Sequence, residues 1–214
     1  KTAIEVLEML KKIVKKNLGK NVGFLLSGGI DSAILAALLP PQTRVYTIKF
    51  VAKKAIDESQ RARKYAQKYR LKHKTIVVTW EDYLKNMNFL MKHKNSPLHP
   101  VEVGLYIAAR KAKKEEINIL MVGNGADSTF GGMDKLLSKD WGFNEFIKRY
   151  TFVDPCSVVK NPVSMREIYQ QYQKGKSIDV INFLKVTHGL GVVQTFENAI
   201  ESAGVSMVAP YEEL

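Results

Sequence analysis

Hydrophobic and polar positions follow two alternating patterns along the first 122 residues. Apolar residues at helical spacing predict helices at 2–18, 33–39, 57–69, 81–93 and 100–116. Shorter runs rich in β-branched and aromatic residues predict strands at 22–26, 44–50, 74–79 and 118–122. Strands that alternate with helices in this way predict an α/β fold, with a doubly wound, mostly parallel sheet covered by helices on both faces.

The pattern changes after Gly132, where no further strand is predicted. Helices are expected at 135–152, 164–173, 177–187 and 194–203, joined by turns that contain proline or glycine. We therefore expect two parts, an α/β core at 1–134 and a helical C-terminal part at 135–214. The helical part is expected to pack over the crevice at the carboxyl ends of the strands.

A short glycine-containing segment, Ser27–Ser32 (Ser-Gly-Gly-Ile-Asp-Ser), joins the first predicted strand to the following helix. Backbone N–H groups of such a loop and the positive end of the helix dipole form a natural anion site. No lysine follows the glycines, and Asp31 stands where a lysine would grip a phosphate. A carboxylate beside phosphates requires a divalent cation, which indicates a magnesium–nucleotide site. The alternative is a plain strand-to-helix turn with Asp31 or Ser32 near the cap.

A second glycine-rich segment, residues 123–132, follows the fourth predicted strand directly. Ligands of doubly wound sheets bind at the carboxyl ends of the strands, so both segments can share one crevice. Gly123 and Gly125 would let the backbone approach a flat ligand such as adenine or ribose. Asp127 is the acid of this stretch and would be a second carboxylate for the metal. Its alternative role is that of a turn aspartate that bonds its own backbone.

Composition narrows the function classes. The chain has 214 residues, 45% hydrophobic and 25% charged, which indicates a globular domain with at most a small appendage. No apolar run approaches the roughly 18 residues of a membrane span. The single cysteine, Cys156, excludes an internal disulfide and a Cys-x-x-Cys site, and we expect a cytoplasmic protein. The sequence does not predict an oligomeric state.

The formal net charge of +12 fits a polyanion partner such as tRNA, an anionic nucleotide substrate, or a lysine-rich solvated surface. The lysines are spread over the predicted helices, and no aromatic residues alternate with them as a base-stacking platform requires. The solvated surface is the favoured interpretation, with tRNA as the alternative.

Together, the segments 27–32 and 123–132 resemble the synthetase domain of the asparagine synthetase family, which belongs to the ATP-pyrophosphatase (PP-loop) group of adenine-nucleotide α-hydrolase-like, Rossmann-like folds. The strand 46–50 and the helix start 57–59 also occur where the family has similar segments. Residues 196–211 resemble the stretch that leads to the family's Pro-Phe-Leu-Asp motif. The similarity spans roughly residues 20–214.

The resemblance implies that ATP adenylates a small-molecule carboxylate, aspartate or an analogue, with loss of pyrophosphate, and that ammonia or an amine then displaces AMP. It implies ATP and Mg²⁺ as cofactors, with residues 1–134 as the nucleotide-binding core. Asp31 and Asp127 would bind magnesium. The residues implied in nucleotide binding are Leu26, Ser27, Gly28, Gly29, Asp31, Ser32, Ile48, Gly123 and Gly125.

The chain departs from the family pattern at the amide-forming end. Asn124 stands where the family has a glutamate near the acyl-adenylate, and Ser128 replaces a second glutamate. No glutaminase domain accompanies the motifs, so nitrogen would come from free ammonia, a separate glutaminase subunit or an amine substrate. The family's late catalytic lysine lies beyond the matched region. Asn124 and Lys49, a cation at the end of the second strand, are therefore the catalytic candidates.

Two further functions fit the same residues. One is a tRNA-modifying PP-loop enzyme, which the basic charge favours. The other is a nucleotide-binding protein that has lost its acyl site, which Asn124 and Ser128 favour.

Overall fold

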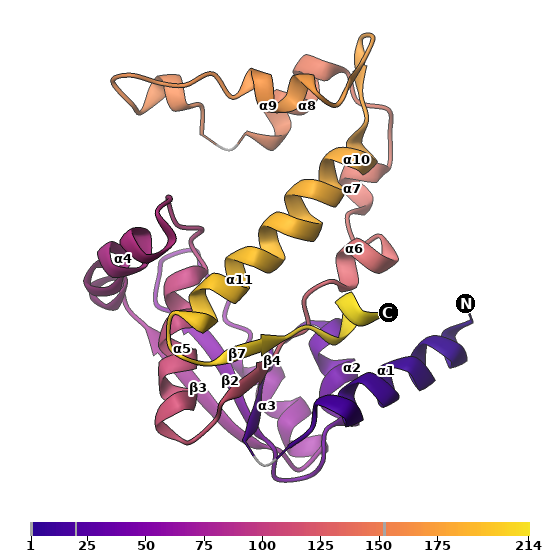
Figure 1. Cartoon of the computed structure of the whole chain (residues 1–214), viewed down its shortest axis with the longest axis vertical. Coiled ribbons are helices and arrows are strands. Elements are labelled where there is room, and N and C mark those ends of the chain that lie inside the picture. Colours follow the sequence, from indigo (N-terminus) through magenta and orange to yellow (C-terminus); the bar gives the residue numbers. More distant parts are fainter. Residues whose placement is uncertain (1, 20, 152) are drawn as a thin grey trace. The chain divides into compact units, whose positions relative to one another are not determined.

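The computed structural model describes residues 2–19, 21–151 and 153–214, and its main sheet has five strands that all run parallel (Figure 1). The strand order is β3-β2-β1-β4-β7. Their bounds are Val22–Leu25 for β1, Arg44–Phe50 for β2, Lys72–Val78 for β3, Ile119–Met121 for β4 and Ser206–Val208 for β7. The predicted doubly wound α/β class is confirmed.

Helices cover both faces of this sheet, because each strand buries alternate side chains on opposite sides. Phe24 and Val45 pack with α1 (Ala3–Asn17), α2 (Ile30–Leu38) and α3 (Ser59–Lys68). Their neighbours Leu25 and Tyr46 face the other cluster, which includes α5 (Glu102–Lys114) and the part of α11 (Gly191–Glu201) from Val193 onward. The helix α4 (Trp80–Lys94) packs on α5. A parallel sheet buried on both faces explains why the central strands β1 and β4 consist of apolar residues and glycine.

Strand register brings the carboxyl ends of the three central strands together. Phe24 of β1 pairs with Val45 of β2 on one side and with Met121 of β4 on the other. The residues that follow these strands therefore emerge at the same edge of the sheet, which is where parallel sheets bind ligands.

The chain divides into two compact units. The first contains residues up to Thr129 together with Val193–Leu214, and the second contains Phe130–Val192. Around Phe146 and Phe183 of the second unit, aromatic rings pack edge to face, with ring centroids 5.2 Å apart. Its elements, together with α6 at the junction, are α6 (Ala126–Phe130), α7 (Asp134–Leu137), α8 (Phe143–Tyr150), η1 (Pro155–Ser157), α9 (Arg166–Gln170), β5 (Gln173–Lys174), β6 (Ser177–Ile178), α10 (Val180–Leu184) and the π-helix η2 (Lys185–Leu190).

The expectation that no strand follows Gly132 is wrong. The short strand β7 extends the main sheet beside β4. The hairpin of β5 and β6 takes the end of the helix expected at 164–173 and the start of the helix expected at 177–187, and the helices α9 and α10 lie in the rest of these ranges. Gly175, with φ of 59°, makes the hairpin turn possible in a region predicted as helical. The helix expected at 135–152 is two helices, α7 and α8.

The two units also divide the chain differently from the expected boundary at residue 134. Residues 193–214 belong with the sheet rather than with the helical part in which they were expected. The identity of 1–134 as a nucleotide-binding domain, and the covering of the crevice by the C-terminal part, stay predictions.

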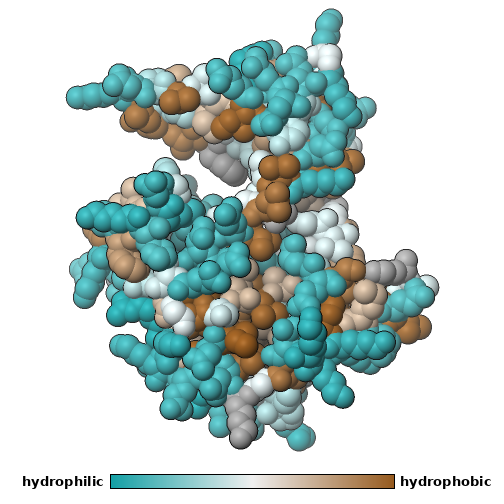
Figure 2. All heavy atoms as spheres, viewed as in Figure 1, coloured by the Kyte–Doolittle hydropathy of each residue, from teal (hydrophilic) through white to brown (hydrophobic). Residues whose placement is uncertain are grey.

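In Figure 2, hydrophilic side chains cover much of the visible face of the first unit. Across the described residues, each helix is too short or too polar to cross a membrane.

Candidate functional site

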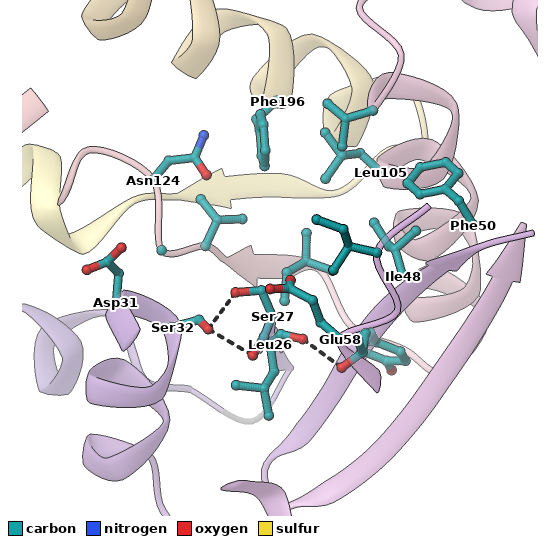
Figure 3. A pocket seen from close by; sticks show the side chains of 17 residues that line it. Leu26, Ser27, Asp31, Ser32, Ile48, Phe50, Glu58, Leu105, Asn124 and Phe196 are labelled. Atoms are coloured by element: carbon teal, nitrogen blue, oxygen red, sulfur yellow. Dashed lines mark hydrogen bonds between the residues drawn. The ribbon is translucent and has the colours of Figure 1, made fainter. Parts of the chain in front are cut away.

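A pocket of about 330 Å³ lies in the first unit, at the carboxyl ends of β1, β2 and β4 (Figure 3). Ile48, Phe50 and Leu105 lie toward one side of it, and Asp31 and Asn124 lie toward the other. The residues that line it are Leu25, Leu26, Ser27, Asp31, Ser32, Tyr46, Thr47, Ile48, Phe50, Ile56, Glu58, Val101, Leu105, Val122, Gly123, Asn124 and Phe196. Within the described chain, this lining contains no lysine or arginine. The volume is at the lower end of the range for small-molecule sites.

The loop between β1 and α2 is held in shape by two serine side chains. The hydroxyl of Ser32 lies 3.0 Å from the carbonyl oxygen of Ser27 and 3.1 Å from that of Gly29. Its oxygen is also 2.8 Å from Ser27 Oγ, and Ser27 Oγ accepts the N–H of Gly29 at 3.1 Å. The loop thereby folds back on itself before α2 begins at Ile30.

The first turn of α2 is open to an anion. Gly29 is the N-cap and has no side chain that could accept the N–H groups of the first turn. Asp31 and Ser32 lie in the first turn, directly after the N-cap, so the alternative of a plain strand-to-helix turn with these residues near the cap stays open. Together with the helix dipole, uncapped N–H groups favour a negatively charged ligand at this point.

Asp31 and Asp127 are brought together from two different segments. Burial raises the pKa of the Asp31 carboxyl, and the negative charge of Asp127 raises it further. Asp127 lies in the first turn of α6, directly after the loop that leaves β4. Two carboxylates that repel each other bind a divalent cation favourably, because the cation replaces repulsion with attraction. The described residues contain no cluster of three or more His, Cys, Asp or Glu side chains, so other ligands would come from water or phosphate.

Gly123 and Gly125 allow the β4 loop to approach its neighbours closely. A Cβ atom on Gly123 would lie 3.4 Å from the backbone nitrogen of Ser32, so the two glycine segments touch. Gly125 has φ of 93°, and a Cβ atom there would collide with the carboxylate of Glu212. Between them, Asn124 turns its side chain toward the pocket (Figure 3).

The start of the loop is also tied to the neighbouring strands. Thr47 donates its hydroxyl proton to the carbonyl oxygen of Leu26 at 2.6 Å, and its oxygen lies 2.8 Å from His73 Nε2. Because the single hydroxyl proton is used, His73 must be the donor to Thr47. Leu26 and Ile48 both line the pocket, and their contact with adenosine stays a prediction.

A short helical turn near residue 211 contacts the backbone of Asp31. The buried Tyr211, in η3 (Pro210–Glu213), donates its hydroxyl to the backbone carbonyl of Asp31 at 2.9 Å. Burial raises the pKa of Tyr211 to about 12, and the charge of Asp31 adds to this shift. Thr129 in turn approaches the carbonyl oxygen of Tyr211, at 3.5 Å.

Lys49, one of the two catalytic candidates, lies outside the pocket lining. Its ammonium group lies 2.7 Å from the carboxylate of Asp57 and does not line the pocket. This hydrogen bond lowers the pKa of Asp57 to about 2. Gly28, Gly29, Gly125 and Asp127 also lie outside the pocket lining, next to residues that form it.

Two groups of pocket residues were not predicted. Phe50, Leu105 and Phe196 add apolar surface from β2, α5 and α11, and only the assembled fold brings these elements together. Glu58 lies at the predicted helix start 57–59, where its side chain makes no cap bond and accepts the N–H of Gly28 instead. The sequence indicated the helix start but not this partner.

Comparison with known proteins points to one family. The sequence pattern of the asparagine synthase family matches residues 5–181. Glutamine-hydrolyzing asparagine synthetase 1 of Bacillus subtilis (strain 168) is 30% identical over 115 residues, which cover 52% of this chain and 18% of that protein. A Mycobacterium bovis protein that bears the same enzyme name provisionally is 30% identical over 134 residues, 60% of this chain and 20% of its own length.

The chain thus spans about a fifth of the length of these curated relatives. Among solved structures, NH3-dependent NAD synthetase from Campylobacter jejuni matches with a TM-score of 0.36 and 14% identity, over 93% of this chain and 91% of that one.

Proposed function

The chain belongs to the asparagine synthase family, and we propose that it is an ATP-dependent ligase that activates a carboxylate with release of pyrophosphate. One observation carries the proposal. The carboxylates of Asp31 and Asp127 interact beside the open first turn of α2, at the polar end of a pocket whose other end is apolar. Such an arrangement suits a nucleotide, with a flat base at one end and charged phosphates at the other.

The residues divide the work of binding ATP. Leu26, Ile48 and Phe196 offer apolar surface for adenine. The loop Ser27–Ser32 offers N–H groups and hydroxyls to the phosphates. No lysine or arginine among the described residues lines this pocket, so a cation from solution would help to balance the phosphate charge. Asp31 and Asp127 would hold that magnesium ion, which stabilises charge on departing pyrophosphate.

The amide-forming half of the reaction depends on Asn124. Its carboxamide can orient a carboxylate substrate or an amine by hydrogen bonds, but it cannot accept a proton as a glutamate does. The nitrogen nucleophile would therefore arrive as free ammonia, from a separate glutaminase subunit or as a neutral amine. Aspartate or an analogue is the proposed carboxylate.

A nucleotide-binding protein without an acyl site is the second candidate, and the neutral Asn124 side chain favours it. Such a protein would bind MgATP without exchanging pyrophosphate. A tRNA-modifying enzyme is the third, favoured by the net charge of +12, and it would bind tRNA with a steep dependence on salt.

The test begins with MgATP binding by the wild-type protein and the Asp31→Asn variant, measured by calorimetry. We expect magnesium-dependent binding that the variant loses by about tenfold or more, as is typical for a lost ligand of a bound ion. Asp57→Asn is the matched control, because Asp57 is an exposed carboxylate outside the pocket. Equal ATP affinity in Asp31→Asn and wild type would reject the proposed magnesium site.

The second stage measures exchange of labelled pyrophosphate into ATP in the presence of single carboxylates, with amino acids and acidic sugars as the panel. Exchange with one compound identifies the activated substrate class. Binding of MgATP without exchange across the panel would instead favour the nucleotide-binding protein.

A further inference from the structure

Two side chains from the beginning of α3 grip the peptide units of Gly28, the first glycine of the Ser27–Ser32 loop. The N–H of Gly28 donates to Glu58 Oε2 at 3.3 Å. Arg61 Nη1 donates to the carbonyl oxygen of Gly28 at 3.2 Å. Glu58 and Arg61 are three residues apart and therefore project from the same side of the helix. We propose that they form a clamp that positions the phosphate-binding loop for the pyrophosphate moiety of ATP.

Local packing shows that the loop and α3 are fitted to each other at this point. A Cβ atom on Gly28 would lie 2.9 Å from the Cβ of Glu58 and 3.2 Å from the Cβ of Arg61. A glycine at 28 is therefore what allows the two segments to approach closely enough for both hydrogen bonds. Glu58 occupies the N-cap position of α3 but makes no cap bond there, so its carboxylate is directed to the loop instead.

The clamp restricts the backbone freedom of this loop. Two adjacent glycines, Gly28 and Gly29, have more backbone freedom than any other pair of residues, and that freedom is lost when an anion binds. Holding both the N–H and the C=O of Gly28 removes much of this freedom before the ligand arrives. Binding to a preorganised loop then costs less conformational entropy.

The clamp also brings a positive charge to the loop. The carboxylate of Glu58 lines the pocket and would repel phosphate on its own. Arg61 contacts the carbonyl oxygen of Gly28, and its guanidinium compensates for that negative charge. Arginine presents five N–H donors, so the contact with Gly28 leaves donors for other partners. Glu58 and Arg61 are thus positioning residues that act through Gly28.

The inference rests on the proposed function, and it predicts a distinct pattern of affinities. Glu58→Ala removes the acceptor of the Gly28 N–H and should weaken MgATP and magnesium pyrophosphate binding by about tenfold, the effect of one hydrogen bond to a charged group. Glu58→Gln keeps an oxygen that accepts the same N–H, so it should restore most of the affinity. Adenosine lacks phosphates, and its affinity should be the same in all of these variants.

Arg61→Ala should weaken the two phosphate ligands in the same way. Lys64→Ala is the matched control, because it removes an exposed cation from the same helix. Isothermal titration calorimetry with MgATP, magnesium pyrophosphate and adenosine measures all the affinities, and thermal unfolding shows that each variant is folded.

The outcomes separate the clamp from other roles. Equal MgATP affinity in Glu58→Ala and wild type, or tighter binding, would overturn the clamp while leaving the proposed function intact. Glu58→Gln as weak as Glu58→Ala would show that charge, rather than the hydrogen bond to Gly28, is what matters, and would also overturn it. If Glu58→Ala or Arg61→Ala lowers the affinity for adenosine as much as that for MgATP, the residue has a general structural role, and the clamp on the phosphate-binding loop is overturned. Wild-type protein that binds no MgATP would overturn the proposed function and the clamp together.

Discussion

Substitution of Gly125 by alanine tests how the loop after β4 is packed. Gly125 has φ of 93°, a conformation that L-residues adopt at a cost of about 1–2 kcal/mol. The new methyl group would also collide with the carboxylate of Glu212, which is the end of an exposed side chain and can turn away at a cost of about 0.5–1 kcal/mol. We expect Gly125→Ala to lower the free energy of unfolding of the first unit by about 1.5–3 kcal/mol.

Two control variants separate the backbone cost from the collision. Gly204 also has positive φ, of 71°, but the nearest atom to its added methyl group would be 4.0 Å away. Gly204→Ala should therefore cost only the backbone share, about 1–2 kcal/mol. Glu212 is exposed, so Glu212→Ala alone should change stability by less than about 0.5 kcal/mol. In the Glu212→Ala background, Gly125→Ala should cost no more than Gly204→Ala.

Urea denaturation followed by circular dichroism measures the free energies, and the four variants around Gly125 and Glu212 form a double-mutant cycle. The expected coupling energy equals the cost of the collision, about 0.5–1 kcal/mol, at the low end of the range found for residues in contact. A coupling energy near zero would refute the reasoning, because it would mean that a side chain at 125 does not meet Glu212. Equal costs for Gly125→Ala and Gly204→Ala would refute it independently.

Three further substitutions have direct readouts. Asp127→Asn should lower the raised pKa of Asp31. At a hundredfold excess over Kd, MgATP should stabilise the wild-type protein against thermal unfolding by about 2.7 kcal/mol, and the variant should lose part of this stabilisation. Equal stabilisation of both proteins by MgATP would contradict the shared metal site. Lys49→Met should return the pKa of Asp57 from about 2 toward its usual 3.8, as measured by NMR titration. Because the pKa of Asp57 is lowered in the folded protein, the stabilisation by this ion pair is present above about pH 4 and lost as the pH falls toward 2. If the pKa of Asp57 stays near 2 in the variant, Lys49 is not the cause of the shift. Tyr211→Phe removes the hydrogen bond to the Asp31 carbonyl and should lower the free energy of unfolding by about 1 kcal/mol in urea, so equal stability would show that this bond contributes nothing.

The sequence predicted a strand or helix correctly where the residues of that element alone show a clear pattern. The strand predicted at 44–50 is β2 with the same bounds, because five of its seven residues are β-branched or aromatic. The strand β7 was missed because three residues, Ser206–Val208, are too few to show any periodicity. Its extended conformation depends on pairing with β4, as in the pair Leu120 and Met207, which a local pattern cannot reveal.

In the candidate site too, local patterns and general rules of the fold were predictable, whereas contacts between distant residues were not. That the two glycine segments meet followed from the rule that strand ends share one edge, and Gly123 does lie against Ser32. Glu58 escaped prediction because its role depends on a bond to Gly28, thirty residues away, rather than on its own helix. The pairing of Lys49 with Asp57 is likewise a contact across a loop, and no spacing rule specifies it.

The position of β7 has a consequence for the order in which the protein is made. Its neighbour β4 ends at Met121, and β7 begins at Ser206, so a ribosome that adds about 5–20 residues per second completes β7 roughly 4–17 seconds after β4. Until then one edge of β4 has unpaired N–H and C=O groups, which makes the nascent sheet prone to pair with other chains. Tyr211, which holds the Asp31 carbonyl from 180 positions away, emerges later still. Assembly of this site is therefore a late event in synthesis, and the nascent chain is open to mispairing during that interval.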